Sequence, residues 1–273
     1  MNEKLNRKIQ KVRDLLQGKK VLVAFSGGVD SSVIARLAKD FCARVLAVTV
    51  ISNTNPPGEI EEAKEVAKEI GVEWKTIEIN ELHNSEFQKN PPNRCYFCKK
   101  ELMTALLKLA KSEKLEFIID GTNADDREDV RPGIRALMEL KIKSPLAEAS
   151  ITKEEIRIMA KEYNLSVYNK PSMACLASRI PYGEDITEKK LRMIAEAETI
   201  IKRLAHVEVV RVRCHKNIAR IEVLPHERVK FFDEDLLDQI VRSLKQVGFI
   251  YVALDLQGYR SGSMNEPSDR SWT

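Results

Sequence analysis

Short apolar runs alternate with longer amphipathic stretches along most of the chain. Each run is too short for a helix and is followed by polar or turn-forming residues, which is typical of buried strands. The runs that predict strands lie at residues 21–25, 44–50, 73–79, 115–120 and 166–168. Helical periodicity separates them. Strands that alternate with helices predict an α/β fold with a doubly wound parallel sheet.

The helical stretches show apolar residues at every third or fourth position and have recognisable ends. An amphipathic helix is expected near the N-terminus, over residues 1–16. Thr152 and Glu155 have the spacing of a capping box. Gly71 marks the end of another helix. The three helices expected between the strands span residues 31–41, 59–70 and 152–163.

The pattern of predicted strands and helices changes near residue 181. Beyond this point the pattern predicts helices and strands at residues 186–204, 207–213, 218–224, 229–247 and 249–256. The first two of these strands have the spacing of a hairpin. We therefore expect an α/β domain over residues 1–182 and a small α+β domain over residues 183–273.

Composition narrows the class of protein. The 273 residues are 43% hydrophobic and 32% charged, which permits one large or two modest domains. A net charge of +4 suits an anionic small-molecule substrate and falls short of a dedicated nucleic-acid binder. No signal peptide and no apolar run of membrane-spanning length is found. Five cysteines without a secretory signal indicate reduced thiols and a cytoplasmic protein.

The most informative stretch is SGGVDSS, residues 26–32, between the first strand and its helix. Two glycines allow a sharp turn, and the amides and hydroxyls lie at the positive end of a helix, which binds anions. Neither GxxxxGK[ST] nor GxGxxG is present. The loop resembles the pyrophosphate loop of PP-loop ATPases, adenine nucleotide α-hydrolase-like enzymes that cleave ATP between its α- and β-phosphates.

This resemblance implies a role for each residue of the loop. Asp30 is implied to help hold Mg²⁺, a cation that prefers carboxylate and phosphate oxygens, and so to take part in catalysis. The alternative is a plain strand–turn–helix junction. The residues implied to hold pyrophosphate are Ser26, Gly27, Gly28, Ser31 and Ser32.

Two other stretches follow strands at the same predicted edge of the sheet. One is residues 49–53, which end the second strand, and the other is GTNADD, residues 121–126, which resembles a second motif of PP-loop enzymes. Ligands of open α/β sheets bind outside the carboxyl ends of the strands. An Asn/Asp turn that opens a helix is the alternative for GTNADD. The nucleotide-binding residues predicted in these stretches are Thr49, Gly121, Thr122, Asn123 and Asp126.

The cysteines suggest a metal site. Cys95 and Cys98 form a CxxC, and Cys175 is expected to follow the last strand at the same edge of the sheet. Three thiolates can hold a 4Fe–4S cluster and leave one iron open. A zinc site completed by a histidine or water, and unlinked thiols, are the alternatives. Cys42 is expected in the core, and Cys214 has no assigned role.

Five motifs together resemble the LarE family over almost the whole chain. They are SGGVDSS, NPPNRCYFC, GTNADD, KPSMACLASRIPYG and GYRSGSMNE. LarE proteins are ATP-dependent sulfur transferases of nickel-pincer nucleotide biosynthesis. The resemblance implies that ATP and Mg²⁺ adenylate a carboxylate of pyridinium-3,5-biscarboxylic acid mononucleotide, which then becomes a thiocarboxylate.

The family has two versions of the sulfur donor. In one, a single cysteine that matches Cys175 gives up its own sulfur and becomes dehydroalanine. In the other, a CxxC joins that cysteine to bind a 4Fe–4S cluster, whose extra sulfide is the donor. Because this chain has Cys95, Cys98 and Cys175, the resemblance implies the second version, supplied by a sulfide source, with sacrifice of Cys175 as the alternative.

Two arginines are candidates for binding the substrate. Arg211 and Arg213 lie on one face of a predicted strand, and paired guanidinium groups suit a phosphate. The resemblance implies that they bind the phosphate of the mononucleotide. Arg179 is a further candidate for this phosphate, and Glu198 lines the site by approximate alignment with the family. A solvated strand face is the alternative for the two arginines.

Other functions remain open. A tRNA 2-thiolation enzyme also combines a PP-loop with three cysteines, but the modest charge and the lack of an aromatic-basic RNA platform argue against nucleic acid. A non-catalytic iron–sulfur or nucleotide sensor would bind ATP without releasing pyrophosphate. An amide-forming ligase leaves three cysteines unexplained. Since related enzymes form larger oligomers, a homo-oligomer without membrane partners is expected.

Overall fold

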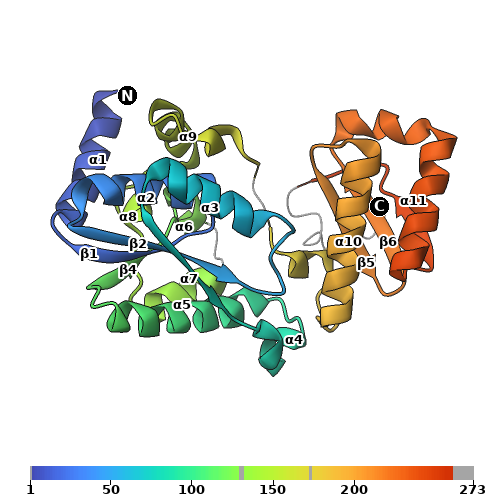
Figure 1. Ribbon diagram of the computed structural model, residues 1–273, viewed down its shortest axis with the longest axis horizontal. Coiled ribbons are helices and arrows are strands. Elements are labelled where there is room, and N and C mark those ends of the chain that lie inside the picture. Colours follow the sequence, from blue (N-terminus) through green and yellow to red (C-terminus); the bar gives the residue numbers. More distant parts are fainter. Residues whose placement is uncertain (1, 129–131, 172–173, 261–273) are drawn as a thin grey trace, which may run out of the picture. The chain divides into compact units, whose positions relative to one another are not determined.

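The computed structural model describes residues 2–128, 132–171 and 174–260, which form two compact units (Figure 1). The first comprises Met1–Phe87 and Pro92–Met173, and the second comprises Gln88–Pro91 and Ala174–Thr273. The motif at residues 258–266 lies outside the described residues from 261 onward, and so do residues 172–173 of the motif at 170–183. The functional division at residue 182 stays a prediction.

A four-stranded parallel sheet forms the centre of the first unit. Its order is β3-β2-β1-β4, and Val21 of β1 pairs with both Val45 of β2 and Phe117 of β4. The predicted parallel α/β sheet is therefore confirmed. The strands are β1 (Lys20–Ala24), β2 (Arg44–Ile51), β3 (Glu73–Glu78) and β4 (Phe117–Ile119).

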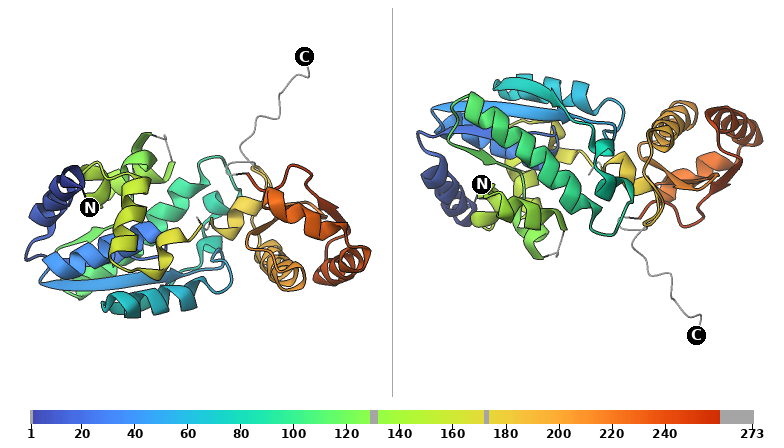
Figure 2. Two further views of the ribbon diagram at one scale, coloured as in Figure 1. Left: turned by 90° about the horizontal axis from the view of Figure 1, so that it is seen from above. Right: turned by 90° about the horizontal axis from the view of Figure 1, so that it is seen from below.

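Helices cover both faces of this sheet (Figures 1 and 2). One face is covered by α2 (Val29–Phe41) and α3 (Glu59–Ile70), and the other by α5 (Arg94–Ser112) and α7 (Pro132–Glu139). Successive side chains of a strand point to opposite faces. β1 therefore contributes to two hydrophobic cores, which explains why its sequence is apolar without alternation.

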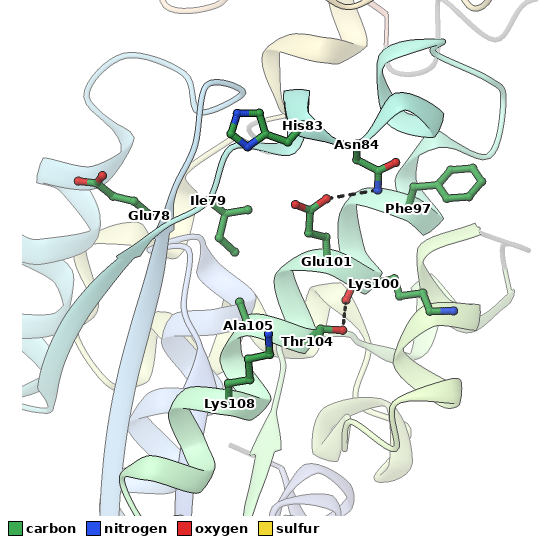
Figure 3. A pocket seen from close by; sticks show the side chains of 10 residues that line it. All are labelled: Glu78, Ile79, His83, Asn84, Phe97, Lys100, Glu101, Thr104, Ala105 and Lys108. Carbon is green, nitrogen blue, oxygen red and sulfur yellow. Dashed lines mark hydrogen bonds between the residues drawn. The ribbon is translucent and has the colours of Figure 1, made fainter.

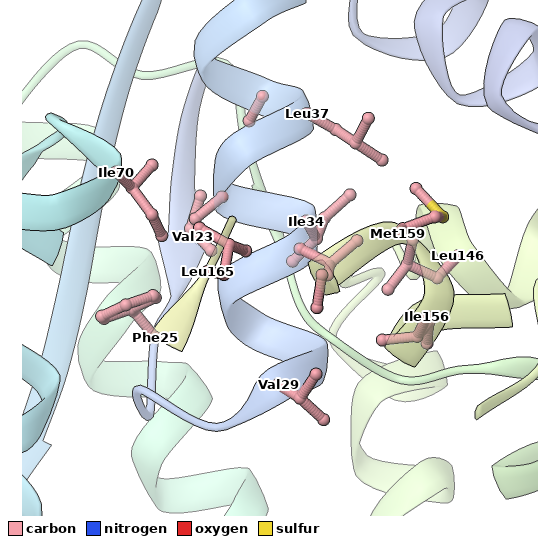
Figure 4. Close-up of a cluster of buried hydrophobic side chains, with 14 of the residues drawn as sticks. Val23, Phe25, Val29, Ile34, Leu37, Ile70, Leu146, Ile156, Met159 and Leu165 are labelled. Atoms are coloured by element: carbon pink, nitrogen blue, oxygen red, sulfur yellow. The ribbon is translucent and has the colours of Figure 1, made fainter. Parts of the chain in front are cut away.

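The core on the α2 face joins elements that are far apart in the sequence (Figure 4). Val23 of β1 and Ile34 of α2 pack with Ile156 and Met159 of α9 (Lys153–Glu162). All four side chains are fully buried. Since burying one such side chain contributes roughly 1.5–3 kcal/mol, this core fixes α9 beside α2.

The order of the strands reverses beside β1. After β3 the chain crosses back and forms β4 on the other side of β1. The loops after β1 and β4 are therefore neighbours at the point where ligands of doubly wound sheets bind. This topology is what brings residues near 30 and near 123 together.

The strand predicted at residues 166–168 is wrong, because Ser166–Asn169 forms a 3₁₀ turn. Local hydrogen bonds shape it: Tyr168 N donates to Leu165 O and Lys170 N donates to Val167 O. Val167 is buried in the core but pairs with no strand of the sheet. Its apolar character therefore reflects core packing and not a strand. Cys175 consequently follows no strand of this sheet.

The second unit is a small α+β fold, as predicted. β5 (Val210–His215) and β6 (Ile218–Val223) form an antiparallel hairpin, and β7 (Tyr251–Leu254) pairs parallel with β6. Helices α10 (Glu188–Ala205) and α11 (Glu234–Val247) pack on one side of this sheet (Figure 2). The helix expected from residue 229 begins later because the Asp233 side chain caps α11 by accepting from Leu236 N.

Several helix ends agree with the sequence. α3 ends before Gly71, whose φ is +74°, and both hydrogen bonds of the Thr152–Glu155 capping box are present. Among the described residues, no helix is both long and apolar enough to cross a membrane. The remaining helices are α1 (Glu3–Leu16), α4 (Ser85–Gln88), α6 (Ala124–Glu128), α8 (Pro145–Glu148), and the 3₁₀ helices Glu81–His83, Leu176–Arg179 and Pro225–Phe232.

Candidate functional site

The loop after β1 is shaped by hydrogen bonds among its own residues. Ser31 Oγ accepts from Ser26 N (3.2 Å) and lies 3.1 Å from Gly28 O, to which it donates. Ser32 Oγ donates to the same carbonyl oxygen (2.8 Å). Gly28 is the N-cap of α2 and has no side chain with which to cap the first amides. Ser31 and Ser32 are buried, so their hydroxyls brace the turn. The loop presents its amides and the exposed Ser26 at the positive end of a helix, an arrangement that binds phosphate.

Gly27 sets the close approach of this loop to α3. Its φ is +68°, in the left-handed region that favours glycine. A Cβ at this position would lie 2.7 Å from Ala63 Cα, a backbone atom of a fully buried residue of α3 that cannot give way. The second residue of the motif is therefore a glycine for two independent reasons.

The loop after β4 is anchored by Asp120. Asp120 Oδ1 accepts from Ser144 Oγ (2.7 Å), and Asp120 Oδ2 accepts from Thr122 Oγ1 (2.6 Å). Asn123 opens α6, since its Oδ1 accepts from Asp126 N (3.2 Å) while Asp126 Oδ2 accepts from Asn123 N (3.2 Å). Thr122 and Asp126 thus act within the loop and fix the orientation of Asn123.

The two loops touch at Gly121. A Cβ on Gly121 would lie 2.8 Å from Ser31 N and 3.0 Å from Asp30 C, so only glycine permits this approach. Asn123 Nδ2 donates to Asp30 Oδ1 (3.2 Å). The structure therefore brings together the loop at residues 26–32 and the GTNADD residues, as the sequence predicted.

Two lysines that the sequence analysis did not select also reach this place. Lys153 forms an ion pair with the second oxygen of Asp30, Oδ2. Lys170 Nζ lies 2.6 Å from Glu62 Oε2 and 3.4 Å from Gly27 O. Both lysines line a cavity of about 120 Å³ together with Ser26, Gly28, Val29, Asp30, Glu59 and Pro171. Lys153 is an ordinary lysine in a charged stretch, and Lys170 opens the motif at residues 170–183 without a pattern that marks it as a ligand.

A second cavity, of about 170 Å³, begins at Ser26 and has mostly apolar walls. Thr49 lines it, but Thr49 Oγ1 also accepts from Trp74 Nε1 (2.9 Å), which ties it to β3. Glu59 lines both cavities, and burial raises the pKa of its carboxyl above the usual 4.5. The apolar walls include Val48, Leu102, Met103 and Leu106. An apolar cavity that continues from a phosphate-binding loop suits the base of a nucleotide.

Cys95 and Cys98 lie in the first turn of α5, three residues apart and thus on one face. Cys95 is exposed, while Cys98 is half-buried with its Sγ 3.9 Å from Glu81 Oε1. Glu81 is almost fully buried, which raises the pKa of its carboxyl. Lys99 lines the apolar cavity, so this end of α5 lies at the carboxyl edge of the sheet, where the CxxC was expected.

A wider hollow of about 610 Å³ lies beside the same helix, between the end of β3 and α5 (Figure 3). Its wall carries charges of both signs, among them Glu78, Lys100 and Lys108. Asn84 Nδ2 donates to Glu101 Oε2 (3.3 Å) across one side. None of the predicted site residues lines this hollow.

In the second unit, Arg179 connects the Cys175 loop to the sheet. The guanidinium donates to Ala174 O (2.6 Å) and Cys175 O (3.1 Å). It also forms a two-point ion pair with Glu198 (2.8 and 3.1 Å), and Glu198 Oε1 accepts from Val212 N (3.0 Å). Arg179 is only 1% exposed. Arg179 and Glu198 therefore form a framework that holds the backbone around Cys175.

Arg211 and Arg213 are buried on β5, so the alternative of a solvated strand face is wrong. Arg213 donates to Glu222 Oε2 (2.6 Å) and to Ser178 O (3.2 Å). The Arg211 guanidinium lies over the Tyr259 ring at 5.3 Å. Burial, and then the positive charge of Arg179, lower the pKa of Arg211. A nearby anion would relieve this cost.

The other two cysteines lie apart from these groups. Cys42 packs half-buried against the first core, and burial raises its pKa to about 11. Cys214 is buried, which also raises its pKa. Both environments disfavour the thiolate that binds metal or attacks an electrophile.

Known proteins resemble this chain either over its first 126 residues or over most of its length. A family model described as NAD synthase matches residues 2–126, which contain both loops. The pyridinium-3,5-bisthiocarboxylic acid mononucleotide synthase of Lactiplantibacillus plantarum is 34% identical over 249 residues, 90% of this chain and 89% of that protein. The chain belongs to the LarE family.

Other relatives match different shares of this chain. An uncharacterised protein of Synechocystis is 42% identical over 247 residues, 90% of this chain and 92% of the relative. The tRNA-specific 2-thiouridylase of Halothermothrix orenii is 29% identical over 191 residues, 56% of this chain and 53% of that protein. The similarity to the LarE relative thus spans both units, whereas the similarity to the thiouridylase spans about half of each chain.

The cysteines of this LarE-family chain match a cluster site in chemistry. Cys95, Cys98 and Cys175 are thiols, and none of them is fully buried. Thiolates are the usual ligands of 4Fe–4S clusters. Within the described parts of the chain, no three His, Cys, Asp or Glu side chains converge on one point. Cys95 and Cys98 belong to the first unit and Cys175 to the second, and each unit presents its own thiols.

Proposed function

We propose that this LarE-family protein is an ATP-dependent sulfur transferase that acts on pyridinium-3,5-biscarboxylic acid mononucleotide. A substrate carboxylate is adenylated with release of pyrophosphate, and a sulfur nucleophile then displaces AMP to leave a thiocarboxylate. The observation that carries the proposal is the meeting of the Ser26–Ser32 loop with Gly121 and Asn123, which contact Ser31 and Asp30, at the reversal of the strand order. The substrate follows from the similarity to the Lactiplantibacillus synthase.

The first unit activates the carboxylate. A carboxylate is a poor electrophile, and bonding to AMP makes its carbon reactive. Amides of the loop and the exposed Ser26 hydroxyl bind the phosphates, and Asp30, oriented by Asn123, helps to hold Mg²⁺. The apolar cavity beside Ser26 takes the adenine. The carboxylate oxygen bonds to the α-phosphorus as the bond to the bridging oxygen breaks, and pyrophosphate leaves with the electron pair.

The second unit binds the substrate. The Arg211 guanidinium lies over the Tyr259 ring. Its burial and the positive charge of Arg179 destabilise the charged form of Arg211. An anionic phosphate at this place lowers that electrostatic cost. Arg213 contributes a second guanidinium on the same strand. Arg179 and Glu198 hold the backbone of the Cys175 loop beside β5. The mononucleotide phosphate is therefore assigned to Arg211 and Arg213.

Cys95, Cys98 and Cys175 are the proposed ligands of a 4Fe–4S cluster. When bound through three thiolates, such a cluster leaves one iron open and supplies a sulfide nucleophile that can be renewed. The exposed position of Cys95 and Cys175 suits ligands that must be reached from outside the core. Asn93, as the N-cap residue of α5, places the CxxC at the start of that helix.

The overall reaction is tested by product analysis. Purified protein with ATP, Mg²⁺, sulfide and the biscarboxylic acid mononucleotide should form AMP and pyrophosphate in equal amounts with the thiocarboxylate, which mass spectrometry detects. ADP and phosphate as products would refute the adenylation. Pyrophosphate release that depends on added tRNA and not on the mononucleotide would favour the tRNA thiolation alternative.

The sulfur donor needs a separate test. Anaerobic iron and sulfide analysis should give a 4Fe–4S cluster in the wild type and little of it in Cys95→Ala, Cys98→Ala or Cys175→Ala. Cys42→Ala and Cys214→Ala are the controls, since burial raises the pKa of both thiols and disfavours the thiolate that binds metal. Loss of H₂S mass from the Cys175 peptide after one turnover of cluster-loaded protein would show that Cys175 is sacrificed instead.

A further inference from the structure

Residues 88–91 belong to the second unit, although the chain on both sides of them belongs to the first. Backbone hydrogen bonds join them to a later stretch of the second unit. Ile186 N donates to Gln88 O (2.8 Å), and Gly183 N donates to Asn90 O (3.0 Å). The second unit therefore holds the chain shortly before the CxxC motif, which lies on α5 of the first unit.

The Asn90 side chain is the centre of this attachment. It is fully buried, and its Nδ2 donates to three backbone carbonyl oxygens, those of Ile180 (3.2 Å), Pro181 (2.7 Å) and Glu184 (3.1 Å). An amide has two N–H groups, so one of them is shared between two acceptors. The φ of Asn90 is +51°, a conformation that asparagine tolerates better than most residues. Asparagine thus suits this position through its donors and through its backbone.

The same short stretch of the second unit also holds Cys175. Arg179 donates to Cys175 O (3.1 Å), and Ile180, which Asn90 contacts, is the next residue. Most of the chain between Cys175 and Ile180 is the 3₁₀ helix Leu176–Arg179. Such a helix rises by about 2 Å per residue, so this path is about 10 Å long. Asn90 and the Cys175 loop are therefore attached to neighbouring residues.

The chain from Asn90 to Cys95 is short and stiff. Five residues extend over about 18 Å at most, and Pro91 and Pro92 each hold φ at about −65°. Cys95 lies in the first turn of α5, directly after this linker. The linker consequently limits how far the CxxC thiols can lie from the stretch that holds Cys175.

We propose that Asn90 is a positioning residue that keeps the CxxC thiols within reach of Cys175, so that the three cysteines can bind one cluster. This inference rests on the proposed cluster and names the residue that assembles its ligands. Thiols on separate units must lose freedom of motion to meet on one cluster. A short, fixed linker reduces that cost because it raises the effective concentration of one thiol near another.

The test uses full-length, cluster-free protein with reduced thiols and dibromobimane, a short reagent that bridges two nearby thiols. Peptide mass spectrometry of the wild type should find Cys175 bridged to Cys95 or Cys98, and also the Cys95–Cys98 bridge within α5. Asn90→Gly permits the positive φ but removes the side-chain donors. Bridges to Cys175 should fall about tenfold, as for the loss of a hydrogen bond of ordinary strength. The Cys95–Cys98 bridge should persist.

Asn164→Gly is the matched control. Asn164 also has a positive φ (+54°), but it lies in the first unit, in the turn after α9. This variant should keep all the bridges of the wild type. If circular dichroism shows that Asn90→Gly unfolds, two glycines inserted between Pro92 and Asn93 replace it in the test. The insertion lengthens the linker, leaves the Asn90 side chain in place, and should lower both bridging to Cys175 and anaerobic iron incorporation.

The outcomes separate this inference from the proposed function. If the wild type forms no bridge between Cys175 and the CxxC motif, the shared cluster site is refuted, and the role of Asn90 with it. If the wild type forms this bridge and folded Asn90→Gly, or the lengthened linker, forms it equally well, the positioning role alone is refuted. Equal loss of the Cys95–Cys98 bridge would also refute it, since that result indicates damage to α5.

Discussion

Charged residues are used differently in the two units. At the nucleotide loops of the first unit, the ion pairs Lys153–Asp30 and Lys170–Glu62 are partly exposed. In the second unit, Arg179–Glu198 and Arg213–Glu222 are buried, with side-chain exposures of 1% and 9% and of 6% and 0%. Exposed pairs are weak and exchange partners readily, whereas buried charges must stay paired.

This difference separates cations that can leave their carboxylates for a ligand from arginines that keep theirs, so Arg213 stays paired with Glu222 when it contacts the proposed phosphate. Under the proposed function, phosphates bind in the first unit beside backbone amides and beside partly exposed ion pairs, whose cations can leave their carboxylates. In the second unit Arg179 donates to two carbonyl oxygens and to Glu198, so its donors serve the Cys175 loop. Arg179 is thus better described as part of the framework than as the phosphate ligand that its sequence position suggested.

The largest effect on stability is expected for Glu222→Gln. Glu222 is fully buried and pairs with both Arg213 (2.6 Å) and Arg220 (3.0 Å), so removing its charge takes the carboxylate away from the buried Arg213 guanidinium. The free energy of unfolding should fall by about 3–5 kcal/mol in urea. Glu3→Gln, at an exposed pair with Arg7, should change it by less than about 1 kcal/mol. Equal losses of unfolding free energy in Glu222→Gln and Glu3→Gln would show that the buried pair contributes no more than the exposed pair.

Asp30→Asn should hardly change stability and should strongly slow pyrophosphate release. Because the Asp30–Lys153 pair is partly exposed, the free energy of unfolding should change by less than about 1 kcal/mol. Pyrophosphate release should nevertheless fall about 10²-fold, since the amide binds Mg²⁺ more weakly than the carboxylate. Titration of Mg²⁺ in a pyrophosphate-release assay checks this, and a normal Mg²⁺ dependence would contradict the assignment.

Gly121→Ala tests the contact between the two loops. The new Cβ would lie 2.8 Å from Ser31 N, so the loops must separate, at a cost of about 1–3 kcal/mol in the free energy of unfolding. ATP affinity should fall as well. Gly133→Ala in α7 is the control, because its Cβ would meet nothing closer than 3.8 Å. Unchanged ATP affinity in Gly121→Ala would show that the loops need not touch.

The smallest effect is expected for Glu59→Gln, and it depends on pH. Burial raises the pKa of Glu59 above 4.5, so the folded state holds this proton more tightly than the unfolded chain. The stabilisation is complete below pH 4.5 and is lost as the pH rises through the raised value. Relative to the wild type, Glu59→Gln should therefore gain stability from acid to neutral pH, by less than about 1 kcal/mol. A difference that does not vary with pH would refute this.

Much of the fold could be read from local patterns. The four strands of the parallel sheet, the glycine-rich loop and the hairpin of the second unit all produce apolar periodicity or turn residues within a few positions. Helix α5 was not predicted, because its start at Arg94 lies in a stretch rich in turn formers. The strand prediction at residues 166–168 was wrong because a buried valine gives the same sequence pattern in a strand and in a 3₁₀ turn.

The sequence by itself determined which loops are the candidates for the chemistry: short side chains and glycines at a strand end have few other uses, so SGGVDSS and GTNADD are recognisable without any contact map. Tertiary structure alone decided which charges stand beside them. Lys153 lies 123 residues from Asp30, and Glu198 lies 19 residues from Arg179. Such pairs form because the reversal of strand order and the packing of α9 and α10 bring distant residues together, and a lysine or glutamate carries no local mark of its future partner.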